Sequence, residues 1–422
     1  DKHRYTAMPR LTTLDKLAIL ADAAKYDASC ASSSARRRDS RNTGGIGSAG
    51  GAGICHSYAP DGRCISLLKV LLTNYCQYDC RYCVNRISSD VQRARFGVQE
   101  LVRLTLEFYK RNYIEGLFLS SGIMVSPDYT MERLVEVARR LREDHLFRGY
   151  IHLKTIPDAD PALIEEAGRY ADRLSINIEL PTSGGLARLA PEKDAGRIRT
   201  AMGTLRLRLE ESGAERRSRR GRGNPEALTA TGQSTQMIVG ADDADDRAIL
   251  TTSASLYAGY RLKRVYYSAF SPIPYPSESL PTAPAPLLRE HRLYQADWLY
   301  RFYGFGVEEI LAGGDGGMLQ TGMDPKLAWA VRHREHFPVD VNRADRETLL
   351  RVPGLGTRAV ARILKARRHR RLGLEDLQRM TVSLAKVRPF VIARGWQPGR
   401  LLDNPALPGL LAPAPRQHLL PL

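Results

Sequence analysis

The chain has 422 residues, 43% of them hydrophobic, so it is too long for a single core and we expect two or three folded units. Lysine and arginine number 63 against 46 aspartates and glutamates, which gives a net charge of +17. This charge favours a polyanionic partner such as nucleic acid, although a general arginine bias of the source would also produce it. No apolar run approaches the roughly 20 residues that span a bilayer, and no signal-peptide pattern is visible. We therefore expect a cytoplasmic protein without a membrane partner.

Residues 1–64 are expected to form an N-terminal helix followed by an extension rich in cysteine and glycine. Leu14, Leu17 and Leu20 fall near one face, which predicts a helix within residues 11–29. A stretch rich in serine, arginine and glycine follows it, as in a flexible loop.

Strand-like apolar runs alternate with helix-like segments between residues 65 and 280. Such alternation predicts right-handed β/α units and a parallel sheet. Six units are too few to close an eight-stranded barrel, so the sequence predicts an α/β fold with an open, partial (β/α)6 TIM-like barrel. The predicted strands are Ile65–Leu72, Gly116–Ser121, Tyr150–Lys154, Arg173–Glu179, Thr235–Val239 and Arg264–Ala269.

Three cysteines, Cys76, Cys80 and Cys83, directly follow the first of these strands with the spacing C-x3-C-x2-C. This position is the carboxyl end of a strand, where β/α folds place their active sites. Three thiolates would leave one iron of a four-iron cluster open for chemistry. A zinc site would usually need a fourth cysteine or histidine nearby, and a disulfide would leave one thiol odd in a chain with no export signal. The spacing therefore favours an iron–sulfur site.

The three other cysteines, Cys30, Cys55 and Cys64, have no such pattern. They could ligate a second cluster with His56 nearby, one could donate a hydrogen atom to a substrate radical, or they could be small core residues. The sequence leaves these alternatives open.

The cysteine spacing, with Tyr82 directly before the last cysteine, resembles the radical S-adenosylmethionine (radical SAM) superfamily. The resemblance implies that Cys76, Cys80 and Cys83 are the catalytic metal ligands of a 4Fe-4S cluster. The open iron would bind the amino and carboxylate groups of SAM, and one electron would cleave SAM to a 5′-deoxyadenosyl radical. A reductant such as flavodoxin or ferredoxin would supply that electron.

Further SAM-binding residues follow from the same resemblance. Where relatives have Gly-Gly-Glu after the second strand, this chain has Ser120, Ser121 and Gly122, so hydroxyl or backbone groups would replace the glutamate contact to the SAM amino group. Lys154 would meet the SAM carboxylate or a substrate phosphate.

Two polar residues of the predicted fourth strand, Asn177 and Glu179, should point to one side. The resemblance implies that a polar residue there binds the SAM ribose, and Glu179 is the candidate. The alternative is that both simply face water at the barrel mouth. Tyr82 would pack near the adenine, and residues 237–240 are similar to the segment that contacts adenine in relatives.

The region 338–397 carries a second motif. Asn342 is the expected cap of a first helix, Pro353-Gly354-Leu355-Gly356 forces a tight hairpin, and Thr357 is the expected cap of a second helix. This arrangement resembles the helix-hairpin-helix (HhH) motif of DNA-binding proteins, an all-α domain in which hairpin and helix N–H groups hold a phosphate. A plain helical hairpin that packs against the barrel or a protein partner is the alternative. The implied DNA contacts are Gly354, Gly356, Thr357, Arg358 and Arg362.

Residues 281–337 are expected to form a linker and an aromatic helical region, and residues 398–422 a proline-rich tail.

Much of the chain resembles radical SAM proteins assigned to DNA modification or repair that carry a C-terminal HhH unit. That resemblance implies an enzyme that acts on a nucleotide in DNA with low sequence specificity, with a partner enzyme completing repair. Two other functions stay open, namely RNA or tRNA modification, and a non-catalytic iron–sulfur DNA-binding protein. The resemblance rests on residues 24–30, 116–122, 152–157 and 178–182.

Overall fold

The computed structural model describes residues 11–24, 54–58, 64–218, 228–380 and 382–411. Their backbone divides into two compact units. The first unit comprises described residues up to Asp243 together with Ser255–Ala285, and the second comprises Ala244–Ala254 together with described residues from Pro286 onward. Among the described residues, no helix is both long and apolar enough to cross a lipid bilayer.

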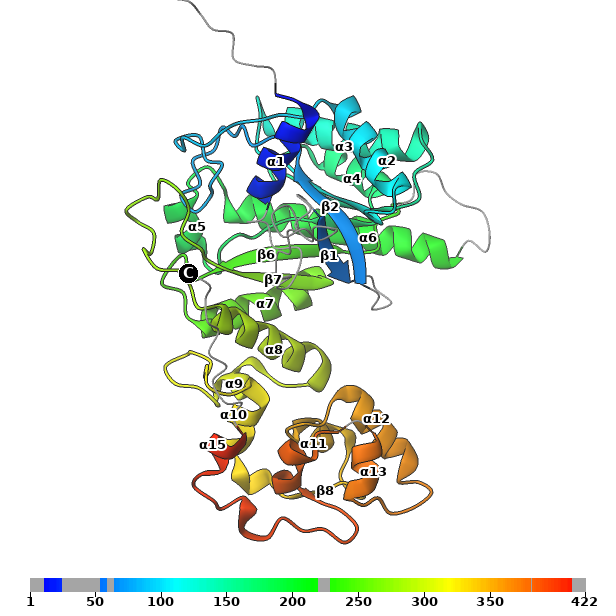
Figure 1. Cartoon of the computed structure of the whole chain (residues 1–422), viewed down its shortest axis with the longest axis vertical. Helices are drawn as coiled ribbons and strands as arrows, with labels where there is room; N and C mark the ends of the chain where they lie inside the picture. The colour runs from blue at the N-terminus through cyan, green and yellow to red at the C-terminus, as the bar shows by residue number, and fades with distance from the viewer. Residues whose placement is uncertain (1–10, 25–53, 59–63, 219–227, 381, 412–422) are drawn as a thin grey trace, which may run out of the picture. The chain divides into compact units, whose positions relative to one another are not determined.

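The first unit contains a curved, seven-stranded sheet whose strand order follows the sequence, from β1 to β7 (Figure 1). Strands β2 to β7 are parallel, which confirms six parallel strands and the open partial barrel. The strand predicted at Arg173–Glu179 is shorter than expected, because β5 ends at Ser175 and Asn177 and Glu179 follow it. Strand β1 was not predicted; it pairs antiparallel with β2 and forms one edge of the sheet. The strands are β1 Ile54–Tyr58, β2 Cys64–Leu71, β3 Gly116–Ser120, β4 Tyr150–Lys154, β5 Arg173–Ser175, β6 Gln233–Val239 and β7 Arg264–Ala269.

Helices connect successive parallel strands, and α2, α3 and α4 pack side by side (Figure 1). The sequence specifies α3 clearly. The Ser126 hydroxyl caps it by accepting the Tyr129 N–H, Pro127 occupies its first turn, and its apolar face is buried. The helices are α1 Thr13–Ala24, α2 Val98–Lys110, α3 Pro127–Glu143, α4 Pro161–Tyr170, α5 Ser183–Leu189, α6 Ala195–Ser218 and α7 Asp246–Tyr260.

The second unit is mainly helical. It is not all-α as expected, because the two-residue strands β8 (Val339–Asp340) and β9 (Val391–Ile392) pair in parallel. The boundary predicted at residue 338 stays a prediction, since contacts group everything from Pro286 onward into one unit. The helices are α8 Leu287–Tyr303, α9 Val307–Leu311, α10 Pro325–Arg332, α11 Arg346–Arg351, α12 Thr357–Ala366, α13 Leu374–Arg379, α14 Leu384–Val387 and α15 Leu407–Leu411, and the 3-10 turns are Arg334–His336, Arg388–Phe390 and Gly399–Leu401.

Both predicted helix caps in the second unit are wrong by position. Asp345, not Asn342, caps α11, with its carboxylate accepting the Thr348 N–H. Asn342 lies in the preceding turn and exchanges two hydrogen bonds with the backbone of Leu372. Gly356 is the cap of α12, so Thr357 is its first helical residue.

Gly116 begins β3 where the strand passes close to its neighbour, because a Cβ there would lie 2.2 Å from the carbonyl oxygen of Tyr150. We expect Gly116→Ala to lower the free energy of unfolding by about 1–3 kcal/mol, since the two strands must separate to admit the methyl group. Chemical denaturation measures this. Gly259→Ala, which meets no atom within 4 Å, is the matched control. Equal stability of the two variants would contradict the packing described here.

Candidate functional site

The loop after β2 carries the three cysteines of the C-x3-C-x2-C motif, and it lies at the carboxyl edge of the parallel sheet. The Leu72 N–H donates to the Ser120 carbonyl, and the Gly122 N–H donates to the Thr73 carbonyl. These bonds place the loop beside the end of β3. A cavity of about 170 Å³ opens there. Of the residues predicted from the sequence, it is lined by Cys76, Cys80, Tyr82, Cys83, Ser121, Gly122, Lys154, Asn177 and Glu179.

All three cysteines are free thiols. Backbone N–H groups point at two of the sulfur atoms. The Ile123 N–H lies 3.4 Å from Cys76 Sγ, and the Asn85 N–H lies 3.4 Å from Cys83 Sγ. Such donors favour thiolate sulfur, the form that binds metal.

Burial acts against thiolates at this site. It raises the pKa of Cys80 to about 12 and that of Cys83 to about 11. At Cys80 and Cys83 the protonated thiol is therefore the stable form near neutral pH in the protein alone, and a bound cation would be needed to keep these two sulfurs deprotonated.

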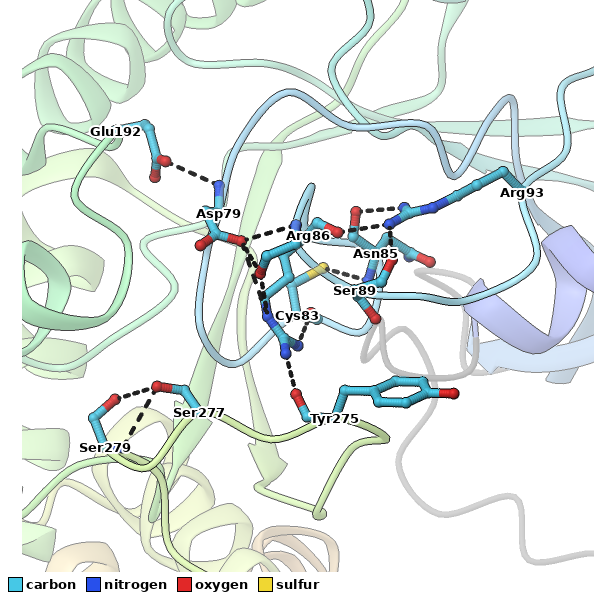
Figure 2. A network of polar contacts seen from close by, with 11 residues as sticks. Asp79, Cys83, Asn85, Arg86, Ser89, Arg93, Glu192, Tyr275, Ser277 and Ser279 are labelled. Atoms are coloured by element: carbon cyan, nitrogen blue, oxygen red, sulfur yellow. Dashed lines mark hydrogen bonds and ion pairs between the residues drawn. The ribbon is translucent and has the colours of Figure 1, made fainter.

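The guanidinium of Arg93 holds the cysteine loop together (Figure 2). Its Nη1 donates to the carbonyls of Asn74 at 2.5 Å and Asn85 at 2.8 Å. Its Nη2 donates to the carbonyls of Arg86 at 2.6 Å and Ser89 at 2.8 Å. Four carbonyls that belong to no helix or strand thus converge on one side chain.

A second arginine, Arg86, connects the loop to the segment after β7 (Figure 2). This buried side chain donates to the Cys83 carbonyl at 3.3 Å and to the Ser88 hydroxyl at 3.1 Å. It also donates to the carbonyl of Tyr275. Asp79 lies 3.9 Å from Arg86, and hydrogen bonds from Ser88 followed by the Arg86 charge lower the pKa of that carboxyl.

The segment after α5 holds the opposite side of the loop. The Asp79 N–H donates to the Glu192 carboxylate at 2.9 Å, and the Arg81 N–H donates to the Leu189 carbonyl at 2.7 Å. These contacts bring the next residue, Lys193, into the cavity.

Lys193 forms an ion pair with Glu179, with Nζ 2.7 Å from Oε1. Burial opposes the ammonium charge, but the Glu179 carboxylate keeps the pKa of Lys193 well above its ordinary value. The Lys193 ammonium also lies 5.9 Å from the ring centroid of Tyr82. The pair is therefore ionised.

Glu179 has a backbone conformation that is rare for a residue with a side chain. Its φ is +66°, in the left-handed region. Two hydrogen bonds hold it there, from its N–H to the Gln236 carbonyl at 3.1 Å and from the Ile238 N–H to its carbonyl at 2.7 Å. Strain of this kind costs about 1–3 kcal/mol and is concentrated at functional sites. It directs a buried carboxylate into the cavity.

The phenolic oxygen of Tyr82 is buried and has no hydrogen-bond partner among the described residues. Burial, followed by the nearby Glu179 charge, raises its pKa well above the ordinary value. The hydroxyl is thus a donor that protein atoms leave unused, beside the cysteines. A bound ligand could satisfy it.

Of the other residues predicted from the sequence, some line the cavity and one does not. Ser120 is buried and does not line the cavity. Gly122 does, and a Cβ there would lie 2.4 Å from the Tyr75 carbonyl, so only glycine permits the close approach. Ile238, in the segment predicted to contact adenine, also lines the cavity.

Cys55 lies far from this edge. It pairs with Leu67, which in turn pairs with Gly116, the first residue of β3. There it packs in a cluster with Ile65, Leu67 and Phe118. This placement favours the core interpretation for Cys55. Cys30 and the side chain of Cys64 lie outside the residues described.

Sequence reasoning missed several cavity residues. No local pattern marks them, because each reaches the cavity only through the packing of distant segments. They are Ala23, Tyr78, Asn85, Asp158, Lys193 and Gln236.

The second unit contains the glycine hairpin, residues 353–356, between α11 and α12. Gly354 has a φ of +84°, and a Cβ there would lie 2.8 Å from Val387 Cγ2. The N–H groups of Gly354, Gly356 and Arg358 have no acceptor in the described part of the chain. The predicted contact Arg362 already donates to the Met380 carbonyl at 3.3 Å.

Residues 70–207 match the family model of the radical SAM superfamily. The chain carries a radical SAM domain. This interval contains the three cysteines and Glu179 with Lys193, and it confirms the predicted superfamily, enzyme class and cofactor pair, 4Fe-4S cluster and SAM. The residues that line the cavity fit these cofactors. They include three free thiols, two of which accept hydrogen bonds from backbone N–H groups, and the Tyr82 hydroxyl, which has no partner among the described residues. No curated protein matches the chain.

Several solved structures are similar to this chain at low identity. They include HydG, a maturase of the [FeFe]-hydrogenase, at 16% identity over 53% of this chain and 46% of that one, with a TM-score of 0.40. Methylornithine synthase (PylB) has 15% identity over 53% of this chain and 59% of that one, with a TM-score of 0.40. The methyltransferase TsrM from Kitasatospora setae has 12% identity over 54% and 38%, with a TM-score of 0.34. The matched part spans about half the length of these proteins.

Arg93→Lys should loosen the cysteine loop of the radical SAM domain, because one ammonium cannot reach four carbonyls at once. We expect a loss of about 1–3 kcal/mol in the free energy of unfolding and reduced iron retention after anaerobic reconstitution. Iron and sulfide assays with chemical denaturation measure both. Arg103→Lys is the control, since Arg103 is exposed and forms no hydrogen bond or ion pair with any described residue. Normal iron retention in Arg93→Lys would refute the role.

Proposed function

We propose that this protein is a radical SAM enzyme that acts on a nucleotide within DNA. The observation that carries the enzymatic part is the single cavity in which three free thiols meet the Glu179–Lys193 pair. When bound, the 4Fe-4S cluster and SAM supply a 5′-deoxyadenosyl radical that abstracts a hydrogen atom.

The chain's own residues have distinct roles in this proposal. Cys76, Cys80 and Cys83 hold the cluster through their sulfurs. Glu179 accepts hydrogen bonds from the ribose hydroxyls, and Lys193 keeps its carboxylate charged and oriented. The buried Tyr82 hydroxyl donates to the bound cofactor. The burial of Cys80 and Glu179 limits the access of water to the reacting groups.

The DNA part of the proposal rests on charge and on the glycine hairpin. The net charge of +17 suits a polyanion, and α12 presents N–H groups and a basic face beside the hairpin. Contacts of this kind position a protein on the backbone without reading sequence. A base within a duplex cannot reach an enclosed radical, so the target nucleotide would be flipped out or already unpaired. The basic residues of this face are Arg358, Arg362 and Lys365, and Arg368 follows the end of the helix.

An electron donor of the flavodoxin or ferredoxin type belongs to the same proposal, because cleavage of SAM needs one electron. A partner repair enzyme would process the product if the modified nucleotide is an intermediate.

SAM cleavage tests the enzymatic part. The anaerobically reconstituted protein should convert SAM to 5′-deoxyadenosine with dithionite. A Cys76, Cys80 and Cys83→Ala triple variant should cleave SAM at least about 100-fold more slowly, because the cluster then has no ligands. Cys55→Ala is the matched control and should keep the activity, since its side chain packs in the core. Retained iron and cleavage in the triple variant would refute the assignment.

Incubation with damaged and undamaged DNA, followed by nucleoside mass spectrometry, then identifies the substrate, with RNA in parallel.

Gly354→Ala tests the DNA-binding part. The methyl group strains the left-handed backbone and contacts Val387, so the hairpin N–H groups move away from a phosphate. We expect about tenfold weaker binding to duplex DNA in fluorescence anisotropy, and wild-type affinity that falls steeply with salt. Gly409→Ala, with open space around it, is the control. Unchanged DNA affinity in Gly354→Ala would show that the hairpin does not bind DNA.

A further inference from the structure

A lysine ammonium is buried beneath the glycine hairpin. Lys326, in the first turn of α10, is 7% exposed. Its Nζ donates to the carbonyl of Leu355 at 2.6 Å, within the hairpin itself. The same atom lies 4.8 Å from the ring centroid of Tyr303, so the aromatic face covers another side of the cation.

This cation has no counter-ion in the described part of the chain. No carboxylate there lies within ion-pair distance of Lys326 Nζ. The nearest candidate, Asp324, caps α10 by accepting the Leu327 N–H at 3.0 Å and lies 3.7 Å from Lys386 Nζ. Burial lowers the pKa of Lys326 to about 7, with Asp324 opposing the shift and Arg351 adding to it. An ammonium with donors to spare, held in such a place, points to an anion from outside.

The bond to Leu355 also sets the direction of the next donor. In a trans peptide the C=O and the following N–H point in opposite directions. Because the Leu355 carbonyl faces Lys326, the Gly356 N–H faces away from it. Gly356 caps the ten-residue helix α12, whose positive end adds to the field at that point.

Tyr303 holds the next peptide. Burial raises the pKa of its phenol, and hydrogen bonding from the Thr357 N–H and from the Trp298 indole partly offsets this shift. Lys326 and Tyr303 together fix the two peptides that open α12. The N–H groups of Gly356 and Arg358, which have no acceptor among the described residues, are left for a ligand.

We propose that Lys326 is a positioning residue for DNA phosphate at the glycine hairpin. Its ammonium orients the Leu355–Gly356 peptide and adds a buried positive charge behind it, on the opposite face of the peptide from the phosphate. This inference rests on the proposed DNA-binding function and adds the residue that prepares the hairpin for an anion.

Lys326→Met tests the inference in the full-length protein with duplex DNA as the probe. Methionine has a similar length and no charge, so the variant should fold at least as stably as wild type, which thermal denaturation checks. We expect DNA affinity to fall about tenfold, because a charge-assisted hydrogen bond that orients the peptide is lost. Lys365→Met removes an exposed charge from the basic face of α12, so it measures the loss of one charge near the hairpin without loss of the buried bond to Leu355.

The pH profile separates positioning by the ammonium from a merely structural role. The charged and titratable groups that face Lys326 are Asp324, Arg351 and the phenol of Tyr303. Below about pH 7 the ammonium is charged, and above it the free protein loses this charge. Wild-type DNA affinity should therefore decrease from about pH 6 to about pH 9, while Lys326→Met stays weak and flat and Lys365→Met keeps the wild-type slope.

The outcomes distinguish this inference from the proposed function. If wild type does not bind duplex DNA, the DNA-binding function itself fails. If wild type binds and Gly354→Ala weakens binding, but Lys326→Met matches wild type or differs no more than Lys365→Met, the inference is overturned and the function stands. Should Lys326→Met fail to fold, a flat wild-type pH profile is sufficient to overturn the inference.

Discussion

The geometry of the radical SAM site depends on the guanidinium of Arg93, which donates hydrogen bonds to four backbone carbonyls. The cysteine loop follows β2 without forming a helix or a strand, so most of its polar backbone groups need partners from elsewhere. Arg93 satisfies carbonyls on both sides of the cysteines, from Asn74 to Ser89. A rigid guanidinium fork can do this, whereas a single ammonium cannot. These bonds hold the backbone on both sides of the cysteines without any help from a metal.

Two other segments hold the same loop from outside. Arg86 connects it to Tyr275, 189 residues away in the sequence, and Asp79 with Arg81 connects it to the segment after α5. The second connection has a chemical consequence, because it carries Lys193 to Glu179. The loop that holds the cysteines and the carboxylate assigned to the ribose are thus positioned by one set of contacts. A substitution that moves the cysteine loop should therefore also move Glu179, and the reverse should hold.

The local sequence pattern was sufficient to predict the six parallel strands and the three cysteines of the site. Both predictions depend only on the periodicity and spacing of residues that are close in the sequence. It was insufficient where a side chain acts across the fold. The Lys193 partner of Glu179 and the Tyr275 partner of Arg86 depend on loop conformations that no periodicity encodes. Strand β1 is short and contains a histidine and a serine, so its identity comes from pairing with β2. The helix caps at Asn342 and Thr357 were misplaced because capping follows backbone geometry, which residue type alone does not determine.

Several buried groups in the two units share one physical property. Among the described residues, each lacks the cation, hydrogen-bond acceptor or counter-ion that would stabilise it. The Cys80 and Cys83 thiols are too buried to ionise without a cation, and the Tyr82 hydroxyl has no acceptor among the described residues. The Lys326 ammonium lies under the hairpin without a carboxylate in the described chain. Each costs stability in the free protein, and each is relieved by a ligand of opposite character: a metal cluster for the thiols, a cofactor acceptor for the phenol and an anion for the ammonium. A fold that retains such groups has its stability coupled to binding, because a ligand that satisfies them in the native state alone shifts the folding equilibrium in its favour.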